Sequence, residues 1–309
     1  MSNPTDETGR TQRRLTVVLD LCLHRVVSEQ CGGRILPFGV RQMIKEYAFV
    51  KFDNDTLREA VQLWCDDRAM ALQRYGDIND WDVRKVTDMS WLFSETDFND
   101  RIDRWDVRNV TSMEGTFFLA RDFNQPLDTW DVRQVTTMKN LFRGVTSFDQ
   151  PLSTWDVSRV TNMQVMFAGA TAFNQPLDTW NVSQVADITC IFSRASSFNQ
   201  SLSTWDVGRV TNMSGMFDGA TSFNQPLDTW EVSQVTDMSY LFSKAASFNQ
   251  PLATWDVGQV INMSAVFWGA SSFNQPLDTW DMRRVRNVRD MLVGATSYQQ
   301  SLPALLQRP

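Results

Sequence analysis

The residues that could carry chemistry in this chain recur at a nearly fixed step. Tryptophan marks the step, since Trp81 is followed after 24 residues by Trp105 and then by a tryptophan every 25 residues up to Trp280. Carboxylates placed one per repeat, about 5 Å apart in a stack, would repel one another and attract Ca²⁺. The structural alternative is that each Asp accepts backbone N–H bonds at a turn, and Asn181 would keep that role without the charge. We favour turns over metal binding for the acid column, which comprises Asp82, Asp106, Asp131, Asp156, Asp206, Glu231, Asp256 and Asp281.

Other groups suited to catalysis are scarce. The single histidine, His24, precedes the repeats, which excludes a multi-histidine metal site and argues against a histidine-based catalytic triad. No glycine-rich phosphate-binding motif occurs. The cysteines are Cys22, Cys31, Cys65 and Cys190, and they form neither a Cys-x-x-Cys pair nor a disulfide framework, so a reducing compartment fits best. We therefore expect a protein that is not an enzyme, with no cofactor and no metal.

Two uncharged columns accompany the acids when each repeat is numbered from its tryptophan as position 1. Asn is usual at position 20, where hydrogen bonds between stacked amides explain it better than ligand binding. Thr fills position 25 without a break from Thr129 to Thr279, which leaves an ice-binding or assembly face as an alternative. We predict a structural ladder at Trp130, Trp155, Trp180, Trp205, Trp230, Trp255, Asn174, Asn199, Asn224, Asn249 and Asn274.

Side chains around positions 10, 11 and 14 differ from one repeat to the next. Mixtures of Tyr, Trp and Arg are typical of binding hot spots, although neutral drift explains the variation equally well. Trp91 and Phe118 belong to this variable set in the first repeats. The candidate binding residues are Tyr240, Trp268, Lys244, Arg194, Arg143 and Lys139.

The pattern within one repeat predicts short elements. A long helix is excluded because Asn-Gln-Pro interrupts positions 20 to 22. Positions 6 to 9 suit a short strand, positions 10 to 16 suit a single helical or 3₁₀ turn, and positions 23 to 3 suit a second short strand. Stacking would bury about nine apolar side chains per repeat, each contributing roughly 1.5–3 kcal/mol. The predicted fold class is therefore a repeat solenoid with short parallel strands, one short helical turn per repeat and an α-helical N-terminal cap.

The segment before the repeats predicts helices. Residues 15–29 carry apolar residues at helical spacing, a second segment starts at Leu36, and Asp53 or Asp55 is placed to cap a third helix. The third helix would present Leu57, Ala60, Val61 and Trp64 as its apolar stripe. We divide the chain into a flexible tail at 1–13, a helical cap region at 14–76, nine repeats at 77–302 and a C-terminal tail at 303–309.

Composition limits the partners. The 309 residues carry a net charge of −7, which argues against nucleic acid and anionic membranes, since both reward clustered Lys and Arg. Residues 15–27 are apolar but too short and too polar to span a bilayer, so we expect no membrane insertion. No signal sequence is recognisable either, which predicts a cytoplasmic location. The expected partner is another protein, and self-association is a second option.

The phrases beginning at Trp155 (WDVSRVTNM) and at Met216 (MFDGATSFNQPL) closely resemble the 25- to 26-residue bacterial surface-protein repeat, a Mycoplasma-type domain of unknown function. That repeat is related to the leucine-rich repeats of the Bacteroides surface antigen A type, and the resemblance covers residues 81 to about 302. It implies a leucine-rich-repeat-like solenoid, a role in adhesion or protein binding and no catalytic residues. The missing export signal favours similarity to the intracellular protist and algal members.

A further alternative concerns the N-terminal segment. Leu36, Pro37, Val40, Ile44 and Tyr47 are spaced in a way that faintly resembles the start of an F-box. An F-box would make the chain a substrate adaptor of a ubiquitin ligase, with the repeats selecting the substrate. A capping helix is the simpler interpretation of the same residues. Our main prediction remains a non-enzymatic protein-interaction scaffold or recognition module.

Overall fold

The computed structural model describes residues 50–301. The chain divides between Val50 and Lys51 into two units, and the second contains all the repeats. Several predictions fall outside the described residues: the two terminal tails, the helices expected at 15–29 and from Leu36, the F-box-like segment, and His24. The domain boundaries proposed above therefore stay predictions.

Within residues 50–301, two short α-helices precede the repeats, and their caps explain where they begin and end. α3 (Asn54–Asp66) is capped by Asp53, whose side chain accepts from the Thr56 N–H while the Thr56 hydroxyl oxygen accepts from the Asp53 N–H. Its buried residues are the predicted stripe of Leu57, Ala60, Val61 and Trp64. Asp67 ends α3 and caps α4 (Arg68–Tyr75). A 3₁₀ helix, η1 (Ile78–Asp80), leads into the first repeat.

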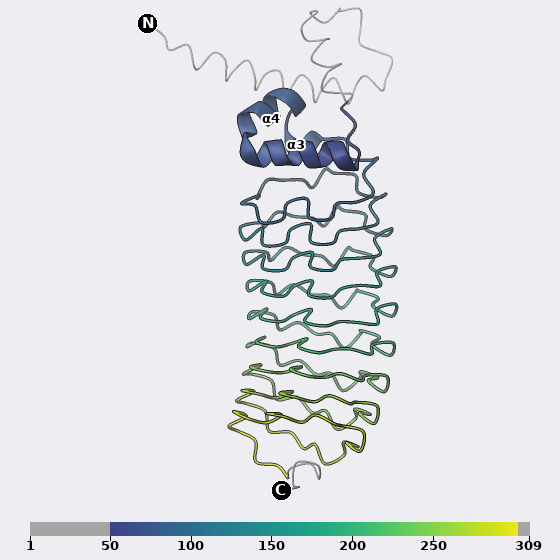
Figure 1. The fold of residues 1–309 in the computed structure, drawn as a ribbon, viewed down its shortest axis with the longest axis vertical. Helices are drawn as coiled ribbons and strands as arrows, with labels where there is room; N and C mark the ends of the chain where they lie inside the picture. The colour runs from purple at the N-terminus through teal and green to yellow at the C-terminus, as the bar shows by residue number, and fades with distance from the viewer. Residues whose placement is uncertain (1–49, 302–309) are drawn as a thin grey trace, which may run out of the picture. The chain divides into compact units, whose positions relative to one another are not determined.

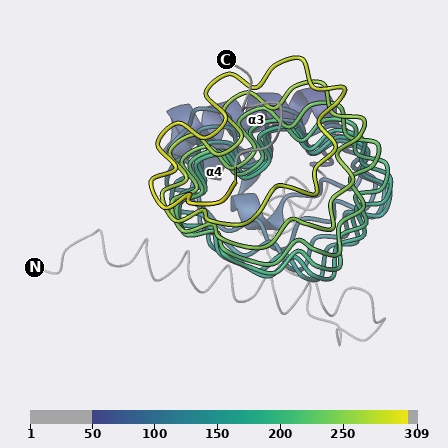
Figure 2. The ribbon, with the colours of Figure 1, turned by 90° about the horizontal axis from the view of Figure 1, so that it is seen from below.

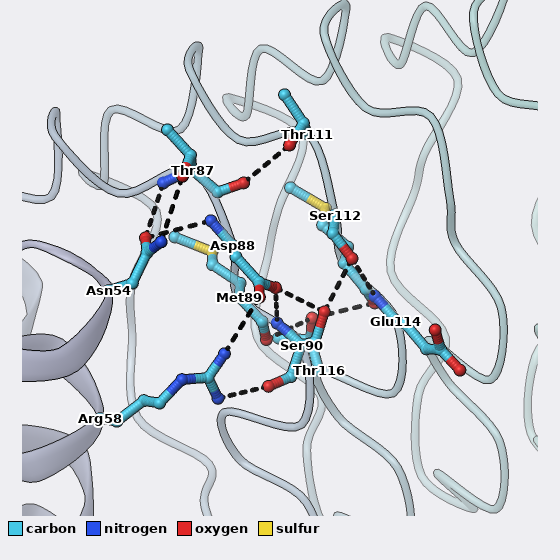
Figure 3. A network of polar contacts seen from close by, with 11 residues as sticks. Asn54, Arg58, Thr87, Asp88, Met89, Ser90, Thr111, Ser112, Glu114 and Thr116 are labelled. Carbon is cyan, nitrogen blue, oxygen red and sulfur yellow. Dashed lines mark hydrogen bonds and ion pairs between the residues drawn. The ribbon is translucent and has the colours of Figure 1, made fainter.

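α3 supplies the first repeat with bonds that a preceding repeat would otherwise make (Figure 3). Inside the stack, the Thr87 carbonyl accepts from the backbone N–H groups of Thr111 and Ser112 in the next repeat, at 2.8 and 3.4 Å. Thr87 and Asp88 have no repeat before them, and their N–H groups donate to the Asn54 side-chain oxygen at 2.9 and 3.2 Å. A helix side chain thus takes the place of a backbone carbonyl at this end of the stack.

Arg58 on α3 supplies a donor that a preceding repeat would otherwise provide, just as Asn54 supplies an acceptor. Within the stack, the position-10 carbonyl of Glu114 accepts from the N–H of Trp91 in the preceding repeat. The corresponding carbonyl of the first repeat belongs to Ser90, and it accepts from the Arg58 guanidinium at 2.5 Å. Arg58 also pairs with Asp88 at 3.5 Å. Because an unpaired edge invites another chain, these contacts give α3 a capping role.

The repeats lie one on another (Figure 1; Figure 2 looks along the stack). Aromatic columns fill the inside of the stack. Within a repeat, the rings at positions 13 and 19 are stacked at 3.8 to 4.2 Å between centroids, as in the Phe192–Phe198 pair at 4.0 Å. Between repeats, Phe192 lies 5.7 Å from Phe167 and 5.9 Å from Phe217. The tryptophans form a third column, in which Trp155 and Trp180 are 6.5 Å apart. These rings are almost fully buried, which identifies the columns as the core.

Polar side chains join the repeats along one side of the stack, which we call the ladder side (positions 20, 21, 25 and 1). The Asn199 side-chain oxygen accepts from the Asn224 N–H at 2.9 Å and from the Gln225 amide at 3.1 Å. The Thr204 hydroxyl donates to the Asp178 carbonyl at 2.7 Å, and the buried Trp205 indole N–H donates to the Leu177 carbonyl at 3.0 Å. The same bonds recur from repeat to repeat, so the side chains here serve the stack.

The predicted fold class, a leucine-rich-repeat-like solenoid of short parallel strands with one helical turn per repeat, is wrong. Residues 50–301 contain no strand, and all their helices precede Trp81. Parallel pairing survives only as isolated bridges, mostly at position 8, such as Asn212 with Asp237. The reason is that the backbone turns every few residues. Along one repeat, several backbone N–H groups donate to the carbonyl three residues earlier: those of Val210, Met216, Asp218, Ala220, Phe223 and Trp230.

Candidate functional site: the turn edge

The variable side chains lie on one segment of each repeat, which we call the turn edge (positions 10, 11, 14 and 15). Between repeats, this segment is joined mainly by backbone groups, with a few side-chain contacts such as the bond from the Gln164 amide to Asp187 at 2.7 Å. Met213, Gly215, Phe217 and Gly219, at positions 9, 11, 13 and 15, donate their N–H groups to carbonyls of the next repeat at 2.7 to 3.1 Å. Since these bonds need no particular side chain, residue types at the turn edge are free to differ.

The turn edge repeats an uncommon backbone conformation. Positions 11 and 15 have φ near +60° or +70° in all nine repeats, a left-handed conformation in which a residue other than Gly costs about 1–2 kcal/mol. This alternation interrupts both strand and helix, which accounts for the failure of those predictions here. Gly holds position 15 in five repeats, whereas position 11 holds Trp91, Gly115, Asn140, Val165, Cys190, Gly215, Tyr240, Ala265 and Asp290.

Side chains at these positions lie along the stack, over the next repeat. The Trp91 ring occupies the space beside Gly115, where a Cβ would meet ring carbons at 2.4 to 2.7 Å. Lys244 lies in the same way over Gly269, with its Cγ 3.6 Å from the place of a Cβ. In these repeats a glycine one repeat later leaves room for the large side chain. Tyr240 and Val165 differ, because Ala265 and Cys190 follow them at position 11.

The structure brings the predicted residues Lys244 and Trp268 together. The Lys244 ammonium nitrogen lies 4.6 Å from the centre of the Trp268 ring, a cation–π contact between neighbouring repeats. Tyr240 is on the same edge, one repeat before Trp268, and is 50 % exposed. Val293, one repeat after Trp268, is 54 % exposed. We call these four residues the C-terminal patch.

A second group of similar composition lies on the first three repeats. Trp91 meets Phe118 edge-to-face at 5.4 Å, and the Arg143 guanidinium lies 5.4 Å from the centre of the Phe118 ring. We call Trp91, Phe118 and Arg143 the N-terminal patch. Of the other predicted residues, Lys139 pairs with Glu114 at 3.9 Å, and Arg194 lies between the two patches over Gly219.

Sequence reasoning singled out Trp91 and Phe118 as variable but did not include them among the candidate binding residues, and it missed Val293. For Phe118 and Val293, the signal is the recurrence of Gly at position 15, which marks the second left-handed residue in five of the nine repeats. Position 14 precedes it and holds Phe118, Arg143, Trp268 and Val293, although Ser243 at the same position is buried. Trp91 stands at position 11 of a repeat with Glu95 at position 15, so this signal does not mark it.

The acid column has the turn chemistry that its sequence pattern favoured. The Asp206 side chain accepts from the Gly208 N–H at 3.0 Å, and Asn181 accepts in the same way from the Ser183 N–H at 3.1 Å. In the first three repeats and the last, an Arg at position 4 pairs with the acid, as Arg283 does with Asp281 at 2.6 Å. Hydrogen bonds from Arg283 lower the pKa of Asp281 from 3.8 to about 2. Among residues 50–301, no group of three or more His, Cys, Asp or Glu side chains is arranged to hold a metal ion.

The two cysteines in the described part, Cys65 and Cys190, are free thiols. Partial burial raises the pKa of both. The helices of residues 50–301 are all too short or too polar to cross a bilayer.

These features define a repeat protein whose stacked 25-residue turns carry a variable edge. The model of the family described as "Mycoplasma protein of unknown function, DUF285" matches the chain three times, over residues 66–153, 126–211 and 200–305. The chain belongs to this repeat family, as the resemblance indicated. A comparison with curated proteins gave no match.

Proposed function

We propose that this chain is a non-enzymatic protein-interaction module whose binding surface is the turn edge. One observation carries the proposal. Seven large apolar side chains are exposed among residues 50–301, and four of them, Trp91, Tyr240, Trp268 and Val293, lie on the turn edge. Exposed aromatics that gather on one surface are typical of protein-binding sites.

The ladder side is a weaker candidate for binding. Its hydroxyl and amide groups already bond within the stack, as the Thr204 hydroxyl does with the Asp178 carbonyl. An ice-binding face would need a regular array of outward hydroxyls, and the Thr column gives its hydroxyl hydrogens to carbonyls of the preceding repeat. We therefore do not propose the ice-binding alternative. The adaptor alternative would be carried by residues 36–47, outside the described residues, and stays a prediction.

The proposal includes a protein without cofactor or catalysis, working in the cytoplasm. Its support is that the sequence holds one histidine, and that free thiols suit a reducing compartment. Cell fractionation with an antibody to the chain tests the location. Recovery in a secreted or membrane-enclosed fraction would contradict it.

The proposed function is tested by affinity purification from native lysate with the tagged full chain and two double variants. Tyr240→Ala with Trp268→Ala removes two aromatic anchors of the turn edge. The matched control, Met70→Ala with Leu72→Ala, removes two exposed apolar side chains of α4, which are 54 % and 41 % exposed. We expect partners to be lost with the first pair and retained with the control. Equal recovery with both pairs would reject the turn edge, and no partner for the wild type would reject the module itself.

A further inference from the structure

Three cations on the turn edge lack a carboxylate partner. Arg143, Arg194 and Lys244 are exposed, and among residues 50–301 none of them has a carboxylate oxygen within 4.0 Å. The acid column differs, because Arg133 and Arg283 each pair with an Asp of their own repeat. The edge therefore carries positive charge that the fold has not neutralised.

The remaining charges of the turn edge leave it positive on an acidic protein. Its cations are Lys139, Arg143, Arg194, Lys244 and Arg289, and its carboxylates are Glu95, Glu114, Asp218 and Asp290. Five cations and four carboxylates give a net charge of +1, against −7 for the whole chain. Two carboxylates are already paired, Glu114 with Lys139 at 3.9 Å and Asp290 with Arg289 at 3.4 Å. Asp218 lies beside Arg194 along the backbone, so we expect the middle cation to attract an anion least.

The three cations stand on the third, fifth and seventh repeats, but their side chains lean in different directions. Arg143 leans back over Phe118 of the second repeat. Arg194 lies forward over Gly219 of the sixth repeat, and Lys244 reaches Trp268 of the eighth. With about 4.8 Å per stacked repeat, the charged ends are about 20 Å and then about 10 Å apart along the stack. An extended peptide advances about 3.3 Å per residue, so carboxylates about six and then about three residues apart would meet the cations.

Aromatic rings flank this row at both ends. Arg143 rests on Phe118, with Trp91 beyond it, and Lys244 rests on Trp268, with Val293 beyond it. A carboxylate can approach the free side of either cation while a neighbouring apolar side chain packs on the ring. The chemistry of the edge is thus apolar at its ends and cationic between them.

We propose, resting on the proposed function, that the turn edge binds an extended acidic peptide segment of a partner protein. The segment runs along the stack, with carboxylates about six and then about three residues apart over Arg143, Arg194 and Lys244. Apolar side chains at its two ends pack on the N-terminal and C-terminal patches. Charge complementarity fixes its register, and the rings supply most of its affinity.

The test uses fluorescence anisotropy of a labelled synthetic peptide, Leu-Glu-Ser-Thr-Ser-Thr-Ser-Glu-Ser-Thr-Glu-Leu, titrated with the full chain at low salt. The comparison peptide has Gln in place of each Glu. The charge variant is Arg143→Gln, Arg194→Gln and Lys244→Gln. The matched control is Arg159→Gln, Arg209→Gln and Arg284→Gln, which removes three cations from position 5, where each bonds to a Gln of the preceding repeat.

We expect the Glu peptide to bind wild type and control within about twofold of each other, and the charge variant about tenfold more weakly. Absence of binding, equal binding of the Gln peptide, or equal weakening in the control would overturn the proposal. Competition by duplex DNA at equal charge would also overturn it, since the edge would then bind anions in general. If the double variant Tyr240→Ala, Trp268→Ala loses its partners from native lysate and the charge variant keeps them, the acidic-peptide inference fails. The proposed function then stands.

Discussion

The ladder side and the turn edge solve the same problem with different groups. Both must join each repeat to the next, once every 25 residues. The ladder side uses side chains, so Asn, Gln, Thr and Trp recur at positions 20, 21, 25 and 1. The turn edge uses mainly backbone N–H and carbonyl groups, so its residue types vary between repeats, although Gly recurs at position 15 in five of them. A repeat protein can therefore vary its surface without weakening its stack where the backbone alone carries the bonds.

The largest loss of stability is expected when a side chain of the core, which the ladder side and the turn edge share, is truncated. Phe192→Ala removes a fully buried ring that contacts Phe167, Phe198 and Phe217. The free energy of unfolding should fall by about 3–5 kcal/mol, because a cavity replaces the ring. Urea unfolding measures the loss. Ser193→Ala, next in the chain but on the turn edge, is the control and should change it by less than about 0.5 kcal/mol.

On the ladder side, the acceptor of a single side chain should matter. Asn199→Ala leaves the Asn224 N–H and the Gln225 amide without their acceptor, at a cost of about 1–3 kcal/mol. Asn199→Asp is the control, since Asp149 already accepts from the Asn174 N–H at 2.9 Å in the same column. Asp should retain most of the stability. Equal losses for both variants would mean that the amide, and not the acceptor oxygen, holds the repeats together.

Sequence reasoning reached the ladder side because its side chains make the bonds there. A residue type that a bond requires must recur in every repeat. The recurrence of Asn and Trp in the columns of Asn174 and Trp180 is therefore enough to predict their roles. The stripe of α3 was also readable, because Asp53 caps the helix and apolar residues follow at helical spacing. These are the parts of the fold in which local sequence and structure agree.

The turn edge was less readable for the opposite reason. Its backbone bonds leave no residue type to recur, and its left-handed positions hold Val165 and Tyr240 where Gly would be expected. Strand and helix were predicted from apolar spacing, but turns place apolar residues inward at the same spacing. Capping by Asn54 and Arg58 was invisible as well, since it depends on contacts with residues more than 30 positions away.

Substitutions at the left-handed positions should change the free energy of unfolding by an intermediate amount. Val165 is β-branched and has φ of 61°, so Val165→Gly should relieve strain and raise the free energy of unfolding by up to about 1 kcal/mol. The reverse change, Gly215→Val, should lower it by about 2 kcal/mol, because its Cβ would also come within 2.9 Å of the Cys190 sulfur. Thermal unfolding distinguishes the two. A fall for Val165→Gly would show that the Val side chain contributes more by packing than it loses in strain.

A smaller effect on stability is expected where the binding surface lies. Tyr240→Ala removes a side chain that is half exposed on the turn edge, and the backbone bond from its N–H to the Ser264 carbonyl remains. The free energy of unfolding should change by less than about 0.5 kcal/mol, while partner binding weakens. Urea unfolding beside the affinity purification separates the two effects. A loss near that of Asn199→Ala would place Tyr240 in the stack and not on a binding surface.

The smallest expected effect is a pH dependence at the end of the stack. Because Arg283 lowers the folded-state pKa of Asp281 to about 2, below the value of about 3.9 for an unfolded chain, the folded protein binds this proton less readily. The pair therefore stabilises the fold fully above pH 4, and its contribution disappears as the pH falls towards 2. Both side chains are exposed, so the contribution is small and weakens with added salt.

Asp281→Asn tests this dependence, with the urea midpoint of wild type and variant compared from pH 6 to pH 2. The difference in urea midpoint between wild type and Asp281→Asn should be constant above pH 4 and shrink below it. The difference between wild type and Arg283→Gln should shrink over the same pH range. NMR titration of the Asp281 carboxyl group provides the direct check, and its pKa should rise towards the usual range in Arg283→Gln. The same urea midpoint for wild type and Asp281→Asn at every pH from 6 to 2 would assign the role of Asp281 to the turn bond from the Arg283 N–H, which an Asn oxygen accepts as Asn181 does. The acid column would then act purely as turn chemistry, in arginine-paired and unpaired repeats alike.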